Sequence, residues 1–206
     1  MPRLTRDNWR KAPWYVRYRL GPNWASNLRR FMIKITHTHA TVELKDVYLG
    51  PGFHLEIPDH GSLICAPGVQ FRRGFVCEIG GNGRVEIGAG TVFTSDALVQ
   101  CSTLIKIGER CGFGQATFIV DGNHRFRDHT KHWLDQGDNF REIHIGDGVA
   151  VNTKCTVIND IGDHAVIGAN SVVSRPVPAY CVAVGAPARV VEYFGPPELK
   201  PEGLEV

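Results

Sequence analysis

The sequence lacks the features of membrane, secreted, nucleic-acid-binding and zinc-binding proteins. No apolar run approaches the 18 or more residues of a membrane span, and no apolar signal-peptide core follows Met-Pro-Arg. A formal net charge of +2 is too small to indicate nucleic acid as the main partner. None of the six cysteines forms a Cys-x-x-Cys pair. We therefore expect a cytoplasmic protein with reduced cysteines in its core and no metal ion.

The sequence does contain a repeat of six residues. Apolar residues recur at every sixth position, as in Ile57, Leu63, Val69 and Phe75, and Gly often follows the apolar residue in later units. The unit is clearest in IGAGTV, IGERCG, IGDGVA, IGDHAV and IGANSV. A period of six fits neither a helix nor an alternating strand. It predicts a three-sided solenoid of short strands with about 18 residues per coil, rather than a β-sandwich, whose turns are about 8–12 residues apart.

The repeat is interrupted at three places. Small slips occur near residues 105 and 160, and residues 121–142 break the pattern completely. The long break, DGNHRFRDHTKHWLDQGDNFRE, is polar and holds three of the nine histidines. A loop of this length that leaves a rigid solenoid is usually functional.

Residues 1–40 lie outside the repeat and carry nine Lys or Arg against a single acid. We expect one or two short helices there, with the charges on a solvated face; an anionic polymer or a membrane surface is the alternative partner. Aromatic residues of this segment are expected to cover the open end of the solenoid, namely Trp9, Trp14, Tyr15, Tyr18 and Trp24. The predicted organisation is a basic, aromatic cap over 1–40, a β-helix over 41–190 and a tail over 191–206.

The C-terminal stretch IGDHAVIGANSVVSRPVPAYCVAVGAPARVV and the repeats over about residues 50–195 resemble the hexapeptide-repeat acyltransferase family, most closely its sugar O-acetyltransferases. The resemblance implies an all-β fold, a left-handed parallel β-helix with a short helical N-terminal segment. It also implies a homotrimer with active sites between subunits, and acetyl-CoA or another acyl-CoA as co-substrate.

The same resemblance implies a catalytic His at the start of the long loop, in patterns close to Asp-x-(Asn/Asp)-His. Here the pattern is Asp121-Gly122-Asn123-His124. O-Acyl transfer needs a base for the acceptor hydroxyl, and an imidazole takes up a proton near neutral pH. We predict His124 as that base and Asp121 as the acid that orients its ring. The acceptor, a saccharide or another small molecule, is expected to contact loop residues: Asn123, Arg125, Arg127, Asp128 and Trp133.

By family position, the C-terminal coils would hold coenzyme A. The resemblance places Ala150 and Thr153 beside the pantetheine arm, and Ala169 lets that arm approach the backbone. Ser174-Arg175 matches a Thr-Lys pair of the family, and Arg175 and Arg189 would meet the phosphates.

Two positions depart from the family pattern. Ala150 stands where many sugar acetyltransferases have Trp, and the smaller side chain would open the acyl pocket. The coil before the loop, VFTSDALVQC, has no Asn for the oxyanion, and Thr94, Ser95 and Gln100 are the alternatives.

Three other functions remain open. N-acyl transfer to an amino sugar or an antibiotic would use the same scaffold. The γ-type carbonic anhydrases share the fold, and His124 and His129 have their His-x₄-His spacing, but residues 61–123 contain no His as a third ligand. A non-catalytic trimeric module would keep the solenoid without needing the His of the loop.

Overall fold

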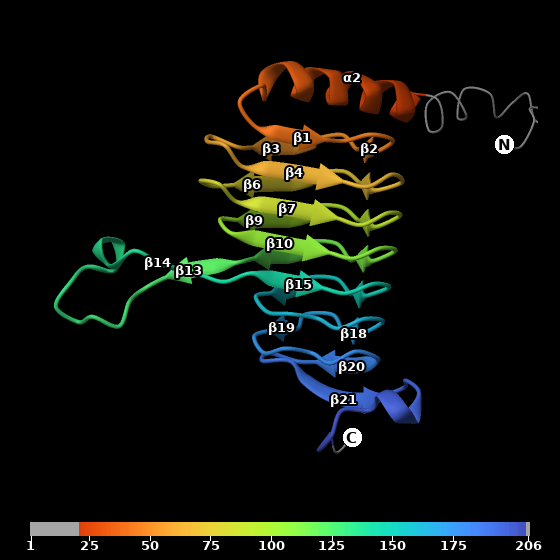
Figure 1. The fold of residues 1–206 in the computed structure, drawn as a ribbon, viewed down its shortest axis with the longest axis vertical. Helices are drawn as coiled ribbons and strands as arrows, with labels where there is room; N and C mark the ends of the chain where they lie inside the picture. The colour runs from red at the N-terminus through yellow and green to blue at the C-terminus, as the bar shows by residue number, and fades with distance from the viewer. Residues whose placement is uncertain (1–20, 205–206) are drawn as a thin grey trace, which may run out of the picture.

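The computed structural model of the protein describes residues 21–204, and these form a parallel β-solenoid with one α-helix at its N-terminal end (Figure 1). The expected capping residues Trp9, Trp14, Tyr15 and Tyr18 lie outside the described residues. Within residues 21–204, no helix is both long and apolar enough to cross a membrane.

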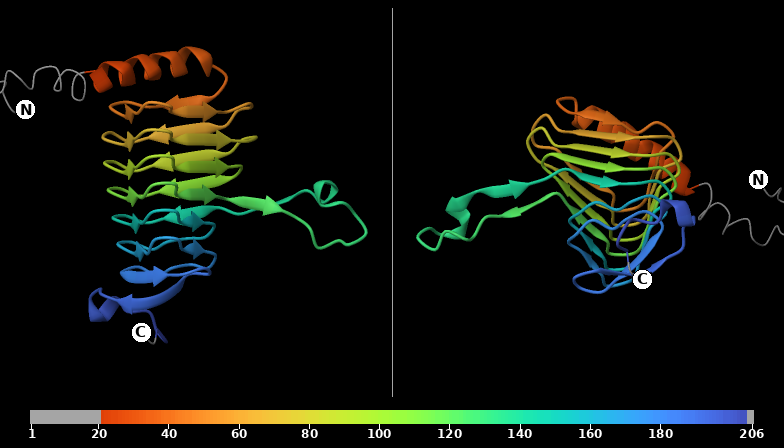
Figure 2. Two further views of the ribbon diagram at one scale, coloured as in Figure 1. Left: turned by 180° about the vertical axis from the view of Figure 1, so that it is seen from behind. Right: turned by 60° about the horizontal axis from the view of Figure 1, so that its bottom comes forward.

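Three sheets make the faces of the solenoid, and each of the first five coils contributes one short strand to each sheet (Figures 1 and 2). In the last two coils, Ile161 and Val177 continue the first sheet only as isolated bridges. The first sheet contains β1 (Thr41–Glu43), β4 (Ser62–Cys65), β7 (Arg84–Ile87), β10 (Leu104–Ile107) and β15 (Ile143–Ile145). The second contains β2 (Tyr48–Leu49), β5 (Gln70–Phe71), β8 (Val92–Phe93), β11 (Gly112–Phe113), β16 (Ala150–Val151), β18 (Val166–Ile167), β20 (Cys181–Val184) and β21 (Arg189–Tyr193). The third contains β3 (His54–Glu56), β6 (Val76–Ile79), β9 (Leu98–Cys101), β12 (Phe118–Val120), β17 (Thr156–Val157) and β19 (Val172–Val173).

Coil length falls along the stack and departs from the expected 18 residues. Gln70 pairs with Val92, 22 residues later, whereas Ala150 pairs with Val166, only 16 residues later. The side chains inside follow this change: the longer coils enclose fully buried aromatic rings, and the shorter ones enclose Val, Ala and Ile. The stacked rings are those of Phe71, Phe75, Phe93 and Phe113.

Residues with positive φ define two of the three corners. We call the turn from the first to the second sheet the first corner, and the turn from the second to the third sheet the second corner. The first corner has positive φ at Asp46, Gly68, Gly90, Arg110, Gly148, His164 and Tyr180. The second corner has it at Gly52, Gly74, Asp96, Ala116, Lys154 and Asn170.

At these corners backbone hydrogen bonds join one coil to the next. The N–H of Ala116 donates to the carbonyl of Ser95 at 3.0 Å, and that of Lys154 donates to Gln115 at 2.7 Å. Gly adopts this left-handed backbone without steric cost, but several of these positions carry other residues. Before β20, the next strand at either corner begins five residues after the previous one ends.

The third corner, from the third sheet to the first sheet of the next coil, absorbs all the variation in coil length. The chain passes directly from Cys101 to Leu104 through two residues there, but needs residues 121–142 between Val120 and Ile143. The slips near residues 105 and 160 fall at this corner too, since Ile161 follows β17 and pairs with Ile145 by an isolated bridge.

Both ends of the solenoid are covered. Helix α2 (Gly21–Thr36) lies across the first coil, and β21 folds back antiparallel on β20 (Figure 1). Beyond it, the 3₁₀ helix η4 (Pro197–Leu199) follows, and Tyr193 and Leu204 pack against the core. The expected role of Trp24 is wrong: its side chain is 70% exposed and turned away from the coil. Polar residues of α2 cover the end instead, because the first coil presents unpaired backbone groups.

The corner geometry makes a matched pair of substitutions informative. Ala116 sits at positive φ, so Ala116→Gly should raise the free energy of unfolding by about 1 kcal/mol. Gly90→Ala should lower it by about the same amount, although the added Cβ meets no atom closer than 3.6 Å. Urea denaturation measures both. Equal stabilities of the two variants would contradict a backbone role for these corners.

Candidate active site

A hairpin leaves the solenoid at the third corner and projects away from the stack (Figures 1 and 2). It is built from β13 (Gly122–His124) and β14 (Asp138–Phe140), which pair antiparallel and place His124 opposite Asp138. The 3₁₀ helix η3 (Trp133–Gln136) lies between them. Gly122 lets the Phe140 ring pack against the hairpin base, because a Cβ at this position would clash with that ring unless the ring moved.

Asp121 anchors the hairpin to the solenoid. Its side chain is buried, and Oδ2 accepts hydrogen bonds from the N–H groups of Ser102 and Thr103 at 2.8 and 2.6 Å. The Thr103 hydroxyl donates to the same oxygen at 2.9 Å. These three donors belong to the third corner of the preceding coil, so Asp121 fixes the point at which the chain departs.

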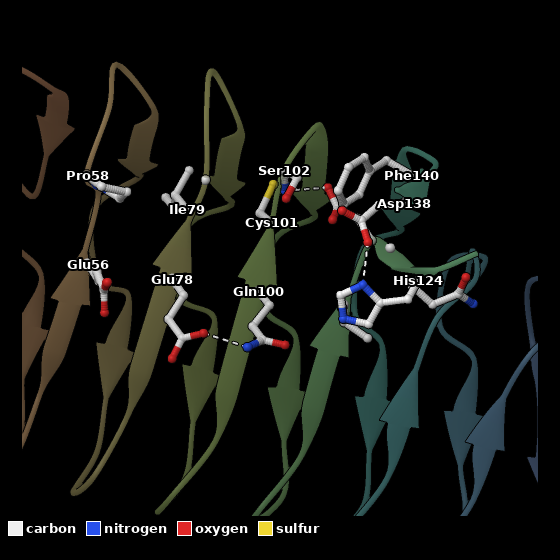
Figure 3. A pocket seen from close by; sticks show the side chains of 15 residues that line it. Glu56, Pro58, Glu78, Ile79, Gln100, Cys101, Ser102, His124, Asp138 and Phe140 are labelled. Carbon is white, nitrogen blue, oxygen red and sulfur yellow. Dashed lines mark hydrogen bonds and ion pairs between the residues drawn. The ribbon is translucent and has the colours of Figure 1, made fainter. Parts of the chain in front are cut away.

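His124 is paired with Asp138 and not with Asp121. Its Nδ1 lies 2.5 Å from Asp138 Oδ1 (Figure 3). The expectation that Asp121 orients His124 is therefore corrected, because corner N–H groups engage Asp121 while the hairpin register brings Asp138 to the ring. The Trp133 ring lies beside the imidazole, with centroids 4.9 Å apart.

Of the other loop residues predicted to contact the acceptor, some lie beside His124 and others bind neighbouring residues of the loop. Asn123 lies beside His124 on β13. Arg125 donates to the Asn139 side chain at 2.9 Å. Asp128 accepts from the N–H and hydroxyl of Thr130, and these bonds hold its pKa below the ordinary value. Arg127 is exposed, with its guanidinium 5.1 Å from the Phe126 ring.

A cavity of about 590 Å³ opens between the hairpin base and the third sheet. Outward side chains of successive strands line it, since Glu56 pairs with Glu78 and Glu78 with Gln100 in the strand register. Figure 3 shows these three in a row that leads toward His124. The Gln100 amide donates to Glu78 at 2.5 Å. A second cavity of about 750 Å³, on the hairpin side, also includes Asn123 and His124.

Cys101 lines the first cavity but is not suited to act as a nucleophile. Burial, and then the charge of neighbouring Asp121, raise the pKa of its thiol to about 12. Since the thiolate is the reactive form, Cys101 stays a protonated thiol at neutral pH.

The predicted coenzyme A residues lie on more than one edge of this chain. Thr153 and Ala169 occupy the second corner in successive coils, because Val151 pairs with Ile167 two residues earlier. Ser174 and Arg175 follow β19 at the third corner, on the side from which the hairpin departs. Ala150 is exposed on the second sheet, and Arg189 begins β21. The chain alone does not bring all six together.

The sequence did not single out Asp138, Glu56 or Glu78. Asp138 is distant from His124 in the sequence, and the hairpin register makes them neighbours. The two glutamates lie at outward strand positions, where charge is ordinary. Gln100 lines the cavity, whereas Thr94 and Ser95, also considered for the oxyanion, follow β8 at the second corner. Within residues 21–204, no cluster of three His, Cys, Asp or Glu is arranged to hold a metal ion.

Comparison with known proteins gives relatives in sequence and neighbours in fold. No family model matches the chain. A probable acetyltransferase of Mycobacterium tuberculosis is 28% identical over 191 residues, covering 88% of this chain and 58% of that protein. A solved hexapeptide-repeat acetyltransferase of Vibrio cholerae, complexed with acetyl coenzyme A, matches with a TM-score of 0.57 and 19% identity over 82% of this chain and 79% of the other. The chain is therefore similar in sequence to a probable acetyltransferase and shares its fold with solved acetyltransferases of the hexapeptide-repeat family.

Other members of this family extend the comparison. A galactoside acetyltransferase in complex with coenzyme A has a TM-score of 0.55 and 19% identity, over 81% of this chain and 70% of that one. The serine acetyltransferase of Haemophilus influenzae is 34% identical over 96 residues, which are 42% of this chain and 36% of that protein. This hexapeptide-repeat chain thus spans about 58% of the length of the first curated relative and 36% of the second.

The anchoring role of Asp121 gives a stability prediction. Asp121→Ala leaves the N–H groups of Ser102 and Thr103 without their acceptor, so the free energy of unfolding should fall by about 1–3 kcal/mol. Asp128→Ala is the matched control, since exposed Asp128 also accepts two hydrogen bonds and should change stability by less than about 0.5 kcal/mol. Chemical denaturation of both variants measures this. Equal losses would contradict the anchor.

Proposed function

We propose that this protein transfers an acyl group from an acyl-CoA thioester, with acetyl-CoA as the leading donor, to a hydroxyl of a sugar or polysaccharide precursor. The supporting observation is the pair formed by His124 and Asp138 at the mouth of a cavity lined by polar side chains. Because Nδ1 faces Asp138, we place the proton of the neutral ring on Nδ1, which leaves the lone pair of Nε2 to act as the general base.

The chemistry follows from that tautomer. As the acceptor oxygen forms its bond to the thioester carbonyl carbon, Nε2 of His124 takes the hydroxyl proton. The C–S bond then breaks, and the imidazolium returns the proton to the departing thiolate. Asp138 stabilises the imidazolium charge between the two steps. No protein nucleophile is needed, which agrees with the raised pKa of Cys101.

The two substrates approach His124 from opposite ends of the stack. The cavity runs from His124 over β9, β6 and β3, toward the N-terminal coils. Glu56, Glu78 and the Gln100 carbonyl offer hydrogen-bond acceptors there, which complement the hydroxyl groups of a saccharide. Thr153, Ala169, Ser174 and Arg175 lie in the C-terminal coils, where we place the acyl donor.

A homotrimer accounts for the division of the donor residues between edges. A donor bound in the groove between two chains would meet Thr153 and Ala169 of one chain and the hairpin, Ser174 and Arg175 of the next. The projecting hairpin also exposes apolar side chains that a neighbouring subunit would cover: Phe126, Trp133, Leu134 and Phe140. We propose that the coil is left-handed, as the family resemblance implies. Six buried cysteines without disulfide bonds support a reducing, cytoplasmic location.

Two substitutions test the catalytic pair. His124→Ala should lower kcat by about 10²–10⁴-fold, and Asp138→Asn by at least about tenfold, because the ring loses the partner that fixes its tautomer. The assay measures release of free CoA from acetyl-CoA, in the presence of sugar and amino-sugar acceptors.

His129→Ala is the matched control, since His129 is an exposed histidine of the same loop and should keep full activity. Full activity of His124→Ala would contradict the mechanism. Turnover with amines alone would correct the acceptor from hydroxyl to amino group. Loss of activity in His129→Ala together with bound zinc would support the carbonic-anhydrase alternative.

A further inference from the structure

Helix α2 packs on the solenoid through its polar side. The Ser26 hydroxyl accepts from the Leu49 N–H at 2.8 Å and donates to the Val47 carbonyl. Arg29 donates to the carbonyl of Leu49 at 3.0 Å, and Arg30 donates to that of Leu44 at 3.1 Å. These contacts satisfy backbone groups of the first coil, which has no further coil above it.

The opposite side of α2 is apolar and exposed. Its side chains follow helical spacing and form one stripe, which we call the outer stripe: Trp24, Leu28, Phe31, Met32 and Ile35, exposed by 70, 47, 59, 47 and 51%. A capping helix ordinarily turns such a stripe toward the core. Contiguous exposed apolar side chains mark a docking surface.

The charges around the outer stripe have one sign. Helix α2 contains Arg29, Arg30 and Lys34 and no acid. A hollow of about 380 Å³ beside the stripe is lined by Arg30, Lys34 and Lys45, together with apolar residues and Asn27, and no acid lines it. The twenty residues that precede α2 in the sequence add six Lys or Arg, four aromatic residues and a single acid.

We infer that α2 docks on an anionic lipid surface, lying in the plane of the interface with its outer stripe among the acyl chains. Apolar residues with Trp and Phe on one side, and cations beside them, are the features of such interfacial helices. The cationic hollow beside Phe31 holds a lipid phosphate group. A second copy of the chain would bring the same cations together, so like charges oppose that occupant.

Vesicle flotation of the full chain tests this inference. The protein should float with phosphatidylcholine vesicles that contain phosphatidylglycerol, and much less with phosphatidylcholine alone. Leu28→Ser with Phe31→Ser should lower binding at least about tenfold, because two half-exposed apolar side chains are lost. Val191→Ser with Leu199→Ser is the control, since these are equally exposed at the opposite end and should not change binding.

Charge reversal tests the hollow separately. The double variant Lys34→Glu, Lys45→Glu should abolish the preference for phosphatidylglycerol. The control variant Lys106→Glu, Lys200→Glu changes the net charge by the same amount at sites far from α2, and it should keep that preference. His124→Ala should bind vesicles as the native protein does, so this test does not depend on the proposed activity.

Three results would overturn the inference. The first is no binding to either vesicle. The second is equal binding to both kinds, which would remove the anionic requirement. The third is a native protein that does not bind vesicles, together with a Leu28→Ser, Phe31→Ser variant whose oligomeric mass, measured by light scattering, or whose Tm differs from that of the native protein. That result would show that another protein surface covers the outer stripe.

Discussion

The rest of the structure depends on backbone hydrogen bonds that join successive coils at two corners, where residues adopt the left-handed (positive φ) conformation. Ala116, Lys154 and Asn170 donate across successive second corners, and the first corner repeats the arrangement. Each ladder fixes the strand spacing, so the flat strands stay in register over the whole stack. Only the third corner is free to change its length. It shortens in the C-terminal coils and expands once, into the hairpin that carries His124.

The candidate active site lies where the chain at that third corner is anchored to the solenoid. Asp121 fixes the departing chain to the corner below β9 through three hydrogen bonds, and antiparallel pairing then sets Asp138 against His124. The solenoid contributes the wall of the cavity, because regular stacking places Glu56, Glu78 and Gln100 one above another. A rigid scaffold thus aligns the proposed base, His124, which lies on a loop, and neither part would position that side chain alone.

The period of six in the sequence predicted the parallel sheets and the break at 121–142, because each coil repeats the same burial of Ile, Val or Phe. The family resemblance, not the period, placed a catalytic His at the start of the loop. It overestimated Asp121 as the partner of that His, since a carboxylate three residues from a His has several other uses, and here corner N–H groups bind Asp121. The pairing of Asp138 with His124 depends on the register of the hairpin, and the exposure of Trp24 depends on how α2 packs on the first coil. No local sequence pattern encodes either.

A crystal structure of the protein with bound coenzyme A tests the central claim most directly. We predict that the sulfur lies within about 3.5 Å of His124 Nε2, the spacing of reacting groups in a near-attack geometry. The pantetheine arm should then extend along the C-terminal coils, past Ala169 or its counterpart in a neighbouring subunit. A sulfur bound far from His124, or an arm that lies over Glu56 and Glu78, would contradict the assignment of His124 as the base between donor and acceptor.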